Sequence, residues 1–151
     1  MNVYDKLAAL GIELPAAAAP AAAYVMSAQT GNVVYLSGHI AKRDGAVWAG
    51  KLGATMTTEE GKVAARRVAI DLLATLHSHL GDLNRVTRIV KVMSLVNSTM
   101  DYTEQHRLKQ SGRGAGGWAG GGGMGGPAAG PPGAGGGGGG PATSSRYAAA
   151  R

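Results

Sequence analysis

The sequence predicts an α+β domain that is incomplete after about residue 108. Three observations support this fold class: two β-rich runs meet at a Gly-Asn pair, a long amphipathic helix follows them, and an apolar strand follows the helix. One helix on a sheet whose later strands are missing is an incomplete layer. The chain therefore divides into an N-terminal helix with its connector (1–23), a partial domain (24–109) and a tail (110–151).

The N-terminal segment is predicted to hold a short helix and an extended connector. Apolar residues at Val3, Leu7 and Leu10 have helical spacing, and Gly11 ends the run. Two prolines interrupt the alanine-rich connector, and acidic residues precede it where a signal peptide has a basic region. No stretch reaches the length of an apolar membrane span. A cytoplasmic protein is expected.

Two strands are predicted over residues 24–30 and 33–40, joined as a hairpin by Gly31-Asn32. A polar turn over residues 42–45 and a short strand over residues 46–48 should follow. Ser37-Gly38 lies inside the second predicted strand. A glycine there marks either a strand irregularity or a place where another group approaches the backbone closely, and the sequence leaves both open.

The clearest helix signal begins at Thr57, which forms a capping box with Glu60. An apolar stripe follows, and Gly81 is well placed to end the helix in the left-handed conformation. The stripe consists of Ala65, Ala69, Leu72, Leu73, Leu76 and Leu80. Residues 86–96 are then apolar on both faces, which predicts a strand covered on both sides. Residues 101–108 resemble the first turns of another helix.

The tail is predicted to be disordered, because 18 of the 29 residues from Gly112 to Gly140 are glycine. A Gly-x-Gly-x-x-Gly match beginning at Gly112 is expected by chance in such a stretch, since no strand precedes it. The net charge of +6 owes half its excess to scattered tail arginines. Nucleic acid is therefore an unlikely partner, although one arginine and one tryptophan in the tail faintly resemble a Gly/Arg-rich RNA-binding segment.

No metal or organic cofactor is expected from the residues. Cysteine is absent, which excludes thiolate sites. His77 and His79 lie two residues apart on the predicted helix, where their side chains point about 200° from each other. His39 and His106 have no acidic cluster near them in the sequence, so a solvated or capping role is favoured for each.

Between residues 24 and 108 the sequence resembles the YjgF/RidA family, also known as endoribonuclease L-PSP. The resemblance rests on the spacing Tyr24-Val-x-x-Ala-x-x-Gly31-Asn32-Val-Val-Tyr-Leu-Ser37-Gly38-His39-Ile40, on the Thr-Glu-Glu helix, and on Gly81-Asp82-Leu83 with the strand after it. It implies a chorismate mutase-like α+β fold and a homotrimer with small-molecule sites between subunits. Typical members hydrolyse enamines and imines such as 2-iminobutanoate to 2-oxo acids and ammonia without a cofactor.

Carried over by position, the resemblance implies that Tyr24 lines the substrate cleft and that the Gly38 backbone faces the substrate beside Ser37. His39 stands where deaminase members commonly have Gln, and His106 where many have Asn. After residue 108 the family pattern requires a second helix, two strands, an Arg that holds the substrate carboxylate and a late Glu that positions water. A guanidinium fixes a carboxylate in a bidentate geometry, and a water attacking an imine needs an oriented acceptor. Neither residue is present.

The last third consists mainly of Gly, Ala, Pro and Arg, which GC-rich codons specify in a shifted frame, so a frameshift near residue 109 is proposed. As written, the chain is expected to be impaired as an imine deaminase. Poor solubility or failure to form the trimer is also expected, because missing strands leave sheet edges exposed. The alternative function is a non-catalytic module that binds a small molecule or RNA and carries the Gly-rich tail as a flexible arm.

Overall fold

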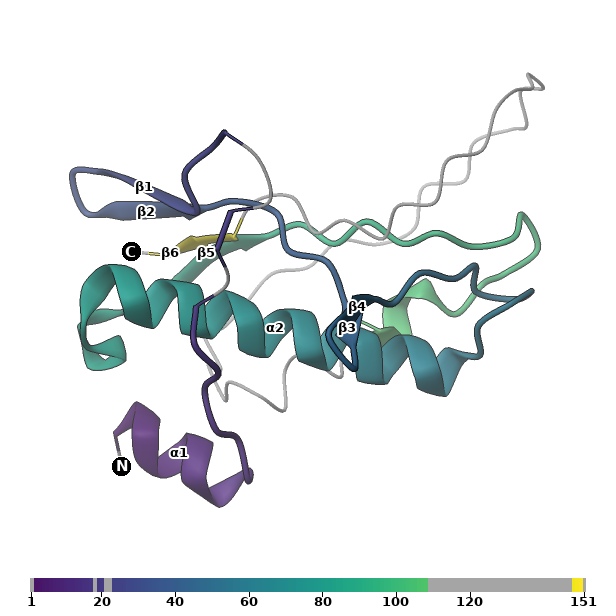
Figure 1. The fold of residues 1–151 in the computed structure, drawn as a ribbon, viewed down its shortest axis with the longest axis horizontal. Coiled ribbons are helices and arrows are strands. Elements are labelled where there is room, and N and C mark those ends of the chain that lie inside the picture. Colours follow the sequence, from purple (N-terminus) through teal and green to yellow (C-terminus); the bar gives the residue numbers. More distant parts are fainter. Residues whose placement is uncertain (1, 18, 21–22, 109–147, 151) are drawn as a thin grey trace, which may run out of the picture.

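The computed structural model describes residues 2–17, 19–20, 23–108 and 148–150. It shows an α+β arrangement in which a small antiparallel sheet lies beside one long helix (Figure 1), as the sequence predicts. The predicted disorder of residues 110–147, and the arginine and tryptophan of the tail, lie outside the described residues. The elements in chain order are α1 (Val3–Ala9), β1 (Ser27–Thr30), β2 (Val33–Leu36), β3 (Lys42–Arg43), β4 (Ala46–Val47), α2 (Thr58–Leu80), η1 (Leu83–Arg85), β5 (Ile89–Val92) and β6 (Ala148–Ala150).

Helix α2 has the limits that its capping residues predict. The Thr57 side chain accepts from the Glu60 amide, and the Glu60 carboxylate accepts from the Thr57 amide at 2.8 Å. Hydrogen bonds from the Thr57 amide and the Thr57 hydroxyl hold the pKa of the Glu60 carboxyl below its ordinary value. At the other end Gly81 has a φ of 75°, the left-handed conformation that glycine adopts at little cost. Local chemistry therefore fixes both ends of the main helix.

The β1–β2 hairpin and its Gly31-Asn32 turn are also confirmed, but β2 ends at Leu36 rather than at residue 40. The expected polar turn is shorter than predicted, because Lys42 and Arg43 already pair with β4. Asp44 and Gly45 make the two-residue turn between these strands, both with positive φ, as in a type I′ hairpin. Strand β3 thus forms where the sequence indicated only a polar turn, whereas β4 lies within the predicted strand over residues 46–48.

The β3–β4 hairpin is attached to α2 through one arginine. The Arg67 Nη1 group donates to the Lys42 carbonyl at 2.9 Å. The guanidinium carbons of Arg43 and Arg67 lie 5.2 and 5.8 Å from the centre of the Trp48 ring, close enough for cation–π attraction. These contacts fix the hairpin beside the N-terminal half of the helix.

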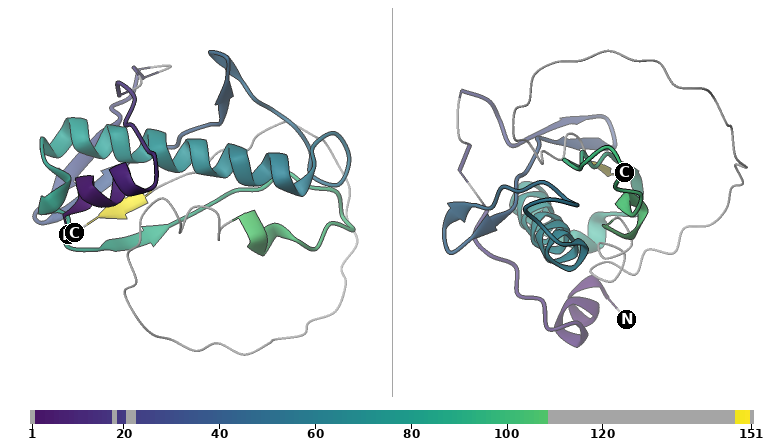
Figure 2. Two further views of the ribbon diagram at one scale, coloured as in Figure 1. Left: turned by 90° about the horizontal axis from the view of Figure 1, so that it is seen from below. Right: turned by 90° about the vertical axis from the view of Figure 1, so that its right-hand side faces the viewer.

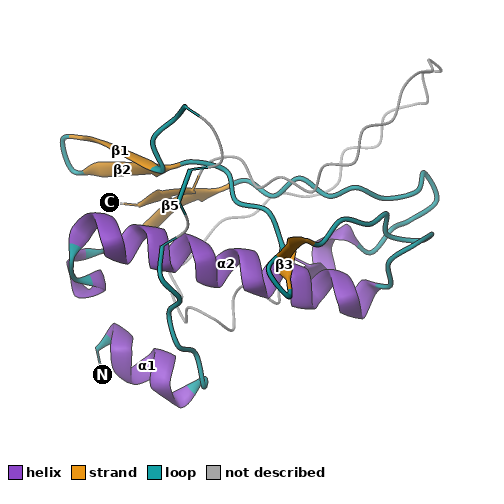
Figure 3. Ribbon diagram, in the orientation of Figure 1, coloured by secondary structure: helices purple, strands orange, loops and turns teal. Residues whose placement is uncertain are grey.

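The main sheet has the strand order β1-β2-β6-β5, with every pairing antiparallel. The strand between β2 and β5 is β6, which consists of Ala148–Ala150. The strand predicted for residues 86–96 is shorter, and it is not covered on both sides. Helix α2 lies along one face of the sheet (Figure 3), and all four residues of β5 are exposed. No described helix covers the opposite face.

The N-terminal helix belongs to the same core as the sheet. The Tyr4 hydroxyl accepts from the Leu83 amide at 3.0 Å, and the Asn84 side chain accepts from the Val3 amide at 3.0 Å. Figure 2 shows α1 beside the C-terminal half of α2. The main core cluster contains Leu7, Ile12, Val34, Leu36, Leu76, Leu83 and Val86. Residues of segment 1–23 therefore help to bury the partial domain that follows them.

Candidate functional site

The end of strand β2 is tied to the chain that precedes β1. The Ser37 hydroxyl donates to the Val25 carbonyl at 2.6 Å, and the Ser37 amide donates to the Met26 carbonyl at 2.9 Å. These two bonds hold residues 24–26 alongside residue 37, so Tyr24 lies close to the Ser37-Gly38 step. The Tyr24 side chain is 44% exposed. The structure thus places Val25 and Met26, which directly follow Tyr24, against Ser37.

His39 follows this step but points into the protein. Its exposure is 5%, its Nδ1 lies 2.8 Å from the Ser37 carbonyl, and its Nε2 lies 2.8 Å from the hydroxyl of Thr75 on α2. Because a carbonyl only accepts, Nδ1 carries a proton; in the neutral ring Nε2 then accepts from Thr75. The expectation of a solvated or capping histidine is wrong for His39, because both ring nitrogens are paired inside the core.

At Gly38 the regular alternation of buried and exposed residues is interrupted. Val34 and Leu36 are buried, as strand alternation requires, but the next buried residues are His39 and Ala41 rather than residues 38 and 40. The alternation therefore slips by one residue at Ser37-Gly38, which confirms the strand irregularity as one of the two interpretations. Gly38 itself is exposed, and its backbone has no hydrogen bond in the described part of the chain.

His106 belongs to a different group of polar residues, at the start of α2. The Thr58 hydroxyl donates to Glu104 at 2.7 Å and lies 2.9 Å from the Tyr102 hydroxyl, and Arg107 pairs with Glu104 at 2.7 Å. The hydrogen bond from Thr58 is the main reason that the pKa of the Glu104 carboxyl lies below its ordinary value; the positive charge of Arg107 adds to it.

His106 is exposed on a helical turn formed by residues 105–108, which is all that the structure shows of the predicted second helix. No described hydrogen bond or ion pair joins His106 to Tyr24, Ser37, Gly38 or His39. The five predicted site residues therefore fall into three groups: Tyr24, Ser37 and Gly38 at the end of β2, a buried histidine, and a separate histidine beside Glu104.

The sequence did not predict the roles of two threonines that form hydrogen bonds within these groups. Thr75 interrupts an apolar helix stripe, where a polar residue signals a buried partner, but the sequence does not say which one. Thr58 follows the cap residue and is indistinguishable in sequence from a solvated helix position. Their roles depend on residues 36 and 46 positions away.

Metal and membrane sites were also considered over the described ranges. No three His, Cys, Asp or Glu side chains come close enough there to hold a metal ion. None of the helices within these ranges has both the length and the apolar character that crossing a membrane requires.

Residues 4–113 match a family model described as "YjgF/chorismate mutase-like, putative endoribonuclease". Protein TCP17 of Trypanosoma cruzi is 46% identical over 105 residues, which cover 69% of this chain and 66% of that protein, just under two thirds of its length. A solved structure of a "putative endoribonuclease" from Shewanella oneidensis MR-1 has 28% identity and a TM-score of 0.67, covering 76% of this chain and 75% of that one.

A second similar structure is that of protein Atu1372 from Agrobacterium tumefaciens, whose function is unknown. It has 30% identity and a TM-score of 0.62, and the match covers 75% of this chain and 67% of that chain.

Proposed function

Because the chain belongs to the YjgF/chorismate mutase-like family and has its fold, we propose that Tyr24, Ser37 and Gly38 form one wall of a small-molecule site. The substrate class is an enamine or imine of the 2-iminobutanoate type. The family activity is the hydrolysis of such compounds to 2-oxo acids and ammonia, and this chain is proposed to be inactive in it. One observation carries the proposal of a site here: the Gly38 backbone is exposed, and without a hydrogen bond to the described residues, at the point where β2 loses its alternation.

The impairment follows from what surrounds Gly38. The Ser37 hydroxyl is occupied by the Val25 carbonyl, and the His39 ring is occupied by Ser37 and Thr75. Backbone groups and the Tyr24 ring therefore remain available for a ligand at this end of β2. Backbone amides can bind a polar atom, but they cannot supply the proton transfer that imine hydrolysis needs.

No described arginine is hydrogen-bonded or ion-paired to residues 37–39, so a carboxylate anchor is lacking at this end of β2. Arg43 and Arg67 lie over Trp48, and Arg107 is paired with Glu104. The guanidinium of Arg85 is held by the Leu80 carbonyl. None of these groups bonds to residues 37–39. A substrate carboxylate would thus lose the bidentate contact that fixes its orientation.

The test is ammonia release from 2-iminobutanoate generated in the reaction mixture, with a complete family member as the positive control. We expect the chain to release ammonia no faster than buffer, while circular dichroism at 222 nm shows that α2 is formed. Release at a rate comparable to that of the complete member would contradict the proposed impairment.

The Gly-rich C-terminal third is proposed to result from a shift of reading frame near residue 109. The family match ends at residue 113, one residue after the first glycine of the tail, which supports this origin. Translation of the gene in the other two frames beyond codon 108 tests it. We expect one frame to encode a helix and an Arg-Ser-x-Val strand; absence of both from either frame would reject the frameshift.

The chain is further proposed not to assemble as the homotrimer that the family resemblance implies. Ile89, Val90 and Val92 of β5 are 37, 51 and 64% exposed, and an exposed apolar strand favours irregular association. Multi-angle light scattering should show aggregates or a monomer, whereas a monodisperse trimer would contradict this. The cytoplasmic location stays a prediction, which fractionation of cells that express the chain would test.

A further inference from the structure

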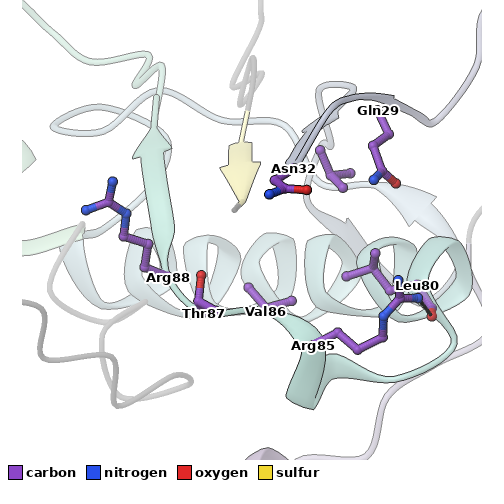
Figure 4. Close-up of a pocket in the computed structure, with 8 residues that line it drawn as sticks. Gln29, Asn32, Leu80, Arg85, Val86, Thr87 and Arg88 are labelled. Atoms are coloured by element: carbon purple, nitrogen blue, oxygen red, sulfur yellow. Dashed lines mark hydrogen bonds between the residues drawn. The ribbon is translucent and has the colours of Figure 1, made fainter.

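A cavity of about 410 Å³ opens at the end of strand β2 that lies opposite Ser37 (Figure 4). Its walls come from the β1–β2 turn, the C-terminal end of α2 and the segment that leads into β5. The cavity is therefore separate from the site proposed at Gly38.

Among the described residues that line the cavity, the charged ones are both arginines and none is a carboxylate. The Arg85 Nη1 group donates to the Leu80 carbonyl at 2.8 Å, which fixes this guanidinium at the rim. Arg88 makes no hydrogen bond or ion pair in the described part of the chain. An unpaired guanidinium beside a second cation creates a positive local potential that favours an anion.

The two amide side chains that line the cavity differ in whether they are already hydrogen-bonded. Gln29 is occupied, since its Nε2 donates to the Gly31 carbonyl at 2.9 Å and its Oε1 lies 3.1 Å from His79. Asn32 has no hydrogen bond within the described residues. Figure 4 draws Asn32 and Arg88 on opposite sides of the opening, with the Arg88 guanidinium pointing away from Asn32. Both residues are exposed, so an anionic head that contacts Asn32 would have to draw the Arg88 side chain inward.

The remaining lining is apolar. Val34 and Val86 are 4 and 8% exposed, and Leu80 completes this side. A cavity of this volume falls within the range of about 300–1,000 Å³ that is usual for small-ligand sites. Apolar walls beside a few free donors select a ligand that has a hydrocarbon body and one charged end.

We propose that this cavity binds a small organic carboxylate, with Arg88 and Asn32 donating to the carboxylate and Val34 and Val86 contacting its apolar body. A planar carboxylate matches the fork of N–H groups on a guanidinium. The proposal does not depend on the function proposed for Gly38, because the two sites share no residue.

The test uses 4-(trifluoromethyl)benzoate as the probe and follows its binding to the full chain by ¹⁹F NMR. 4-(Trifluoromethyl)benzamide, which has nearly the same shape and no charge, is the matched control ligand. Arg88→Gln removes the free cation, and Lys91→Gln is the control variant, because it makes the same change of net charge at an exposed position of β5 outside the cavity.

We expect the benzoate to bind the unmodified chain at least about tenfold more tightly than the benzamide, since only the benzoate can form charge-assisted hydrogen bonds. Arg88→Gln should raise the Kd for the benzoate by about tenfold, and Lys91→Gln by less than about twofold. Equal binding of both probes would overturn the proposal. An equal effect of the two variants, or no effect of Arg88→Gln, would overturn it as well.

Discussion

The polar residues at the two ends of strand β2 differ in whether they are hydrogen-bonded within the protein. At the Ser37 end, the hydroxyl and the His39 ring are hydrogen-bonded within the protein, and the exposed Gly38 backbone is left for a ligand. At the Asn32 end, Asn32 and Arg88 have no such partners and border a cavity. The contrast shows that the type of a polar residue does not determine its availability. Its internal hydrogen bonds do.

Replacing His39 should give the largest effect on stability. His39→Leu leaves the Ser37 carbonyl and the Thr75 hydroxyl without their partner, which should lower the free energy of unfolding by about 2–4 kcal/mol. His79→Leu is the matched control, because this exposed histidine contacts Ser27 and Gln29 of β1; its loss should stay below about 1 kcal/mol. Urea unfolding followed at 222 nm measures both. Equal losses would contradict the greater importance of the buried, doubly paired His39.

A smaller difference is expected between Ser37→Ala and Asn32→Ala. The first removes the hydrogen bond to the Val25 carbonyl and should lower the free energy of unfolding by about 1 kcal/mol. The second removes no described hydrogen bond and should leave stability within about 0.5 kcal/mol, while it weakens binding of the benzoate probe. The same urea titrations check stability. A larger loss for Asn32→Ala would show that this amide is already engaged.

The smallest effect concerns acid stability at the start of α2, where His106 lies. The folded pKa of Glu104 is lowered, so its contribution to stability is complete above the ordinary glutamate value of about 4.3 and is lost as the pH falls through the folded pKa. Glu104→Gln should therefore lose less stability than the unmodified chain on acidification through this range. Urea midpoints at a series of pH values test this; parallel curves for both proteins would contradict it.

Local signals were sufficient to predict the main helix from the sequence. Thr57, Glu60 and Gly81 act through neighbours within a few residues, so the limits of α2 could be predicted. The two-residue turn of the β1–β2 hairpin is local in the same sense. The burial of β5 was predicted wrongly, because an apolar run does not show whether a second layer covers the sheet. Ala148–Ala150 carry no β-strand signal, and their place depends on the gap between β2 and β5.

The candidate site was predictable only in part. The glycine inside a strand pointed to Ser37-Gly38, and the structure adds the reason, which is the slip of alternation at that step. The inward direction of His39 follows from the slip and could not be predicted before its position was known. The cavity at Arg88 depends on three segments that are distant in the sequence, and no local pattern marks it.

A titration of the ¹⁵N-labelled chain with 4-(trifluoromethyl)benzoate tests most directly whether a carboxylate binds at the Asn32 end of β2 and not at the Ser37 end. The probe carries a carboxylate, which the Arg88 cavity should hold and the Gly38 end should not. We predict saturable shifts of the backbone amides of Asn32, Thr87 and Arg88 and of the Asn32 side chain, with Ser37, Gly38 and His39 unchanged. Saturable shifts confined to Ser37 and Gly38 would contradict the account.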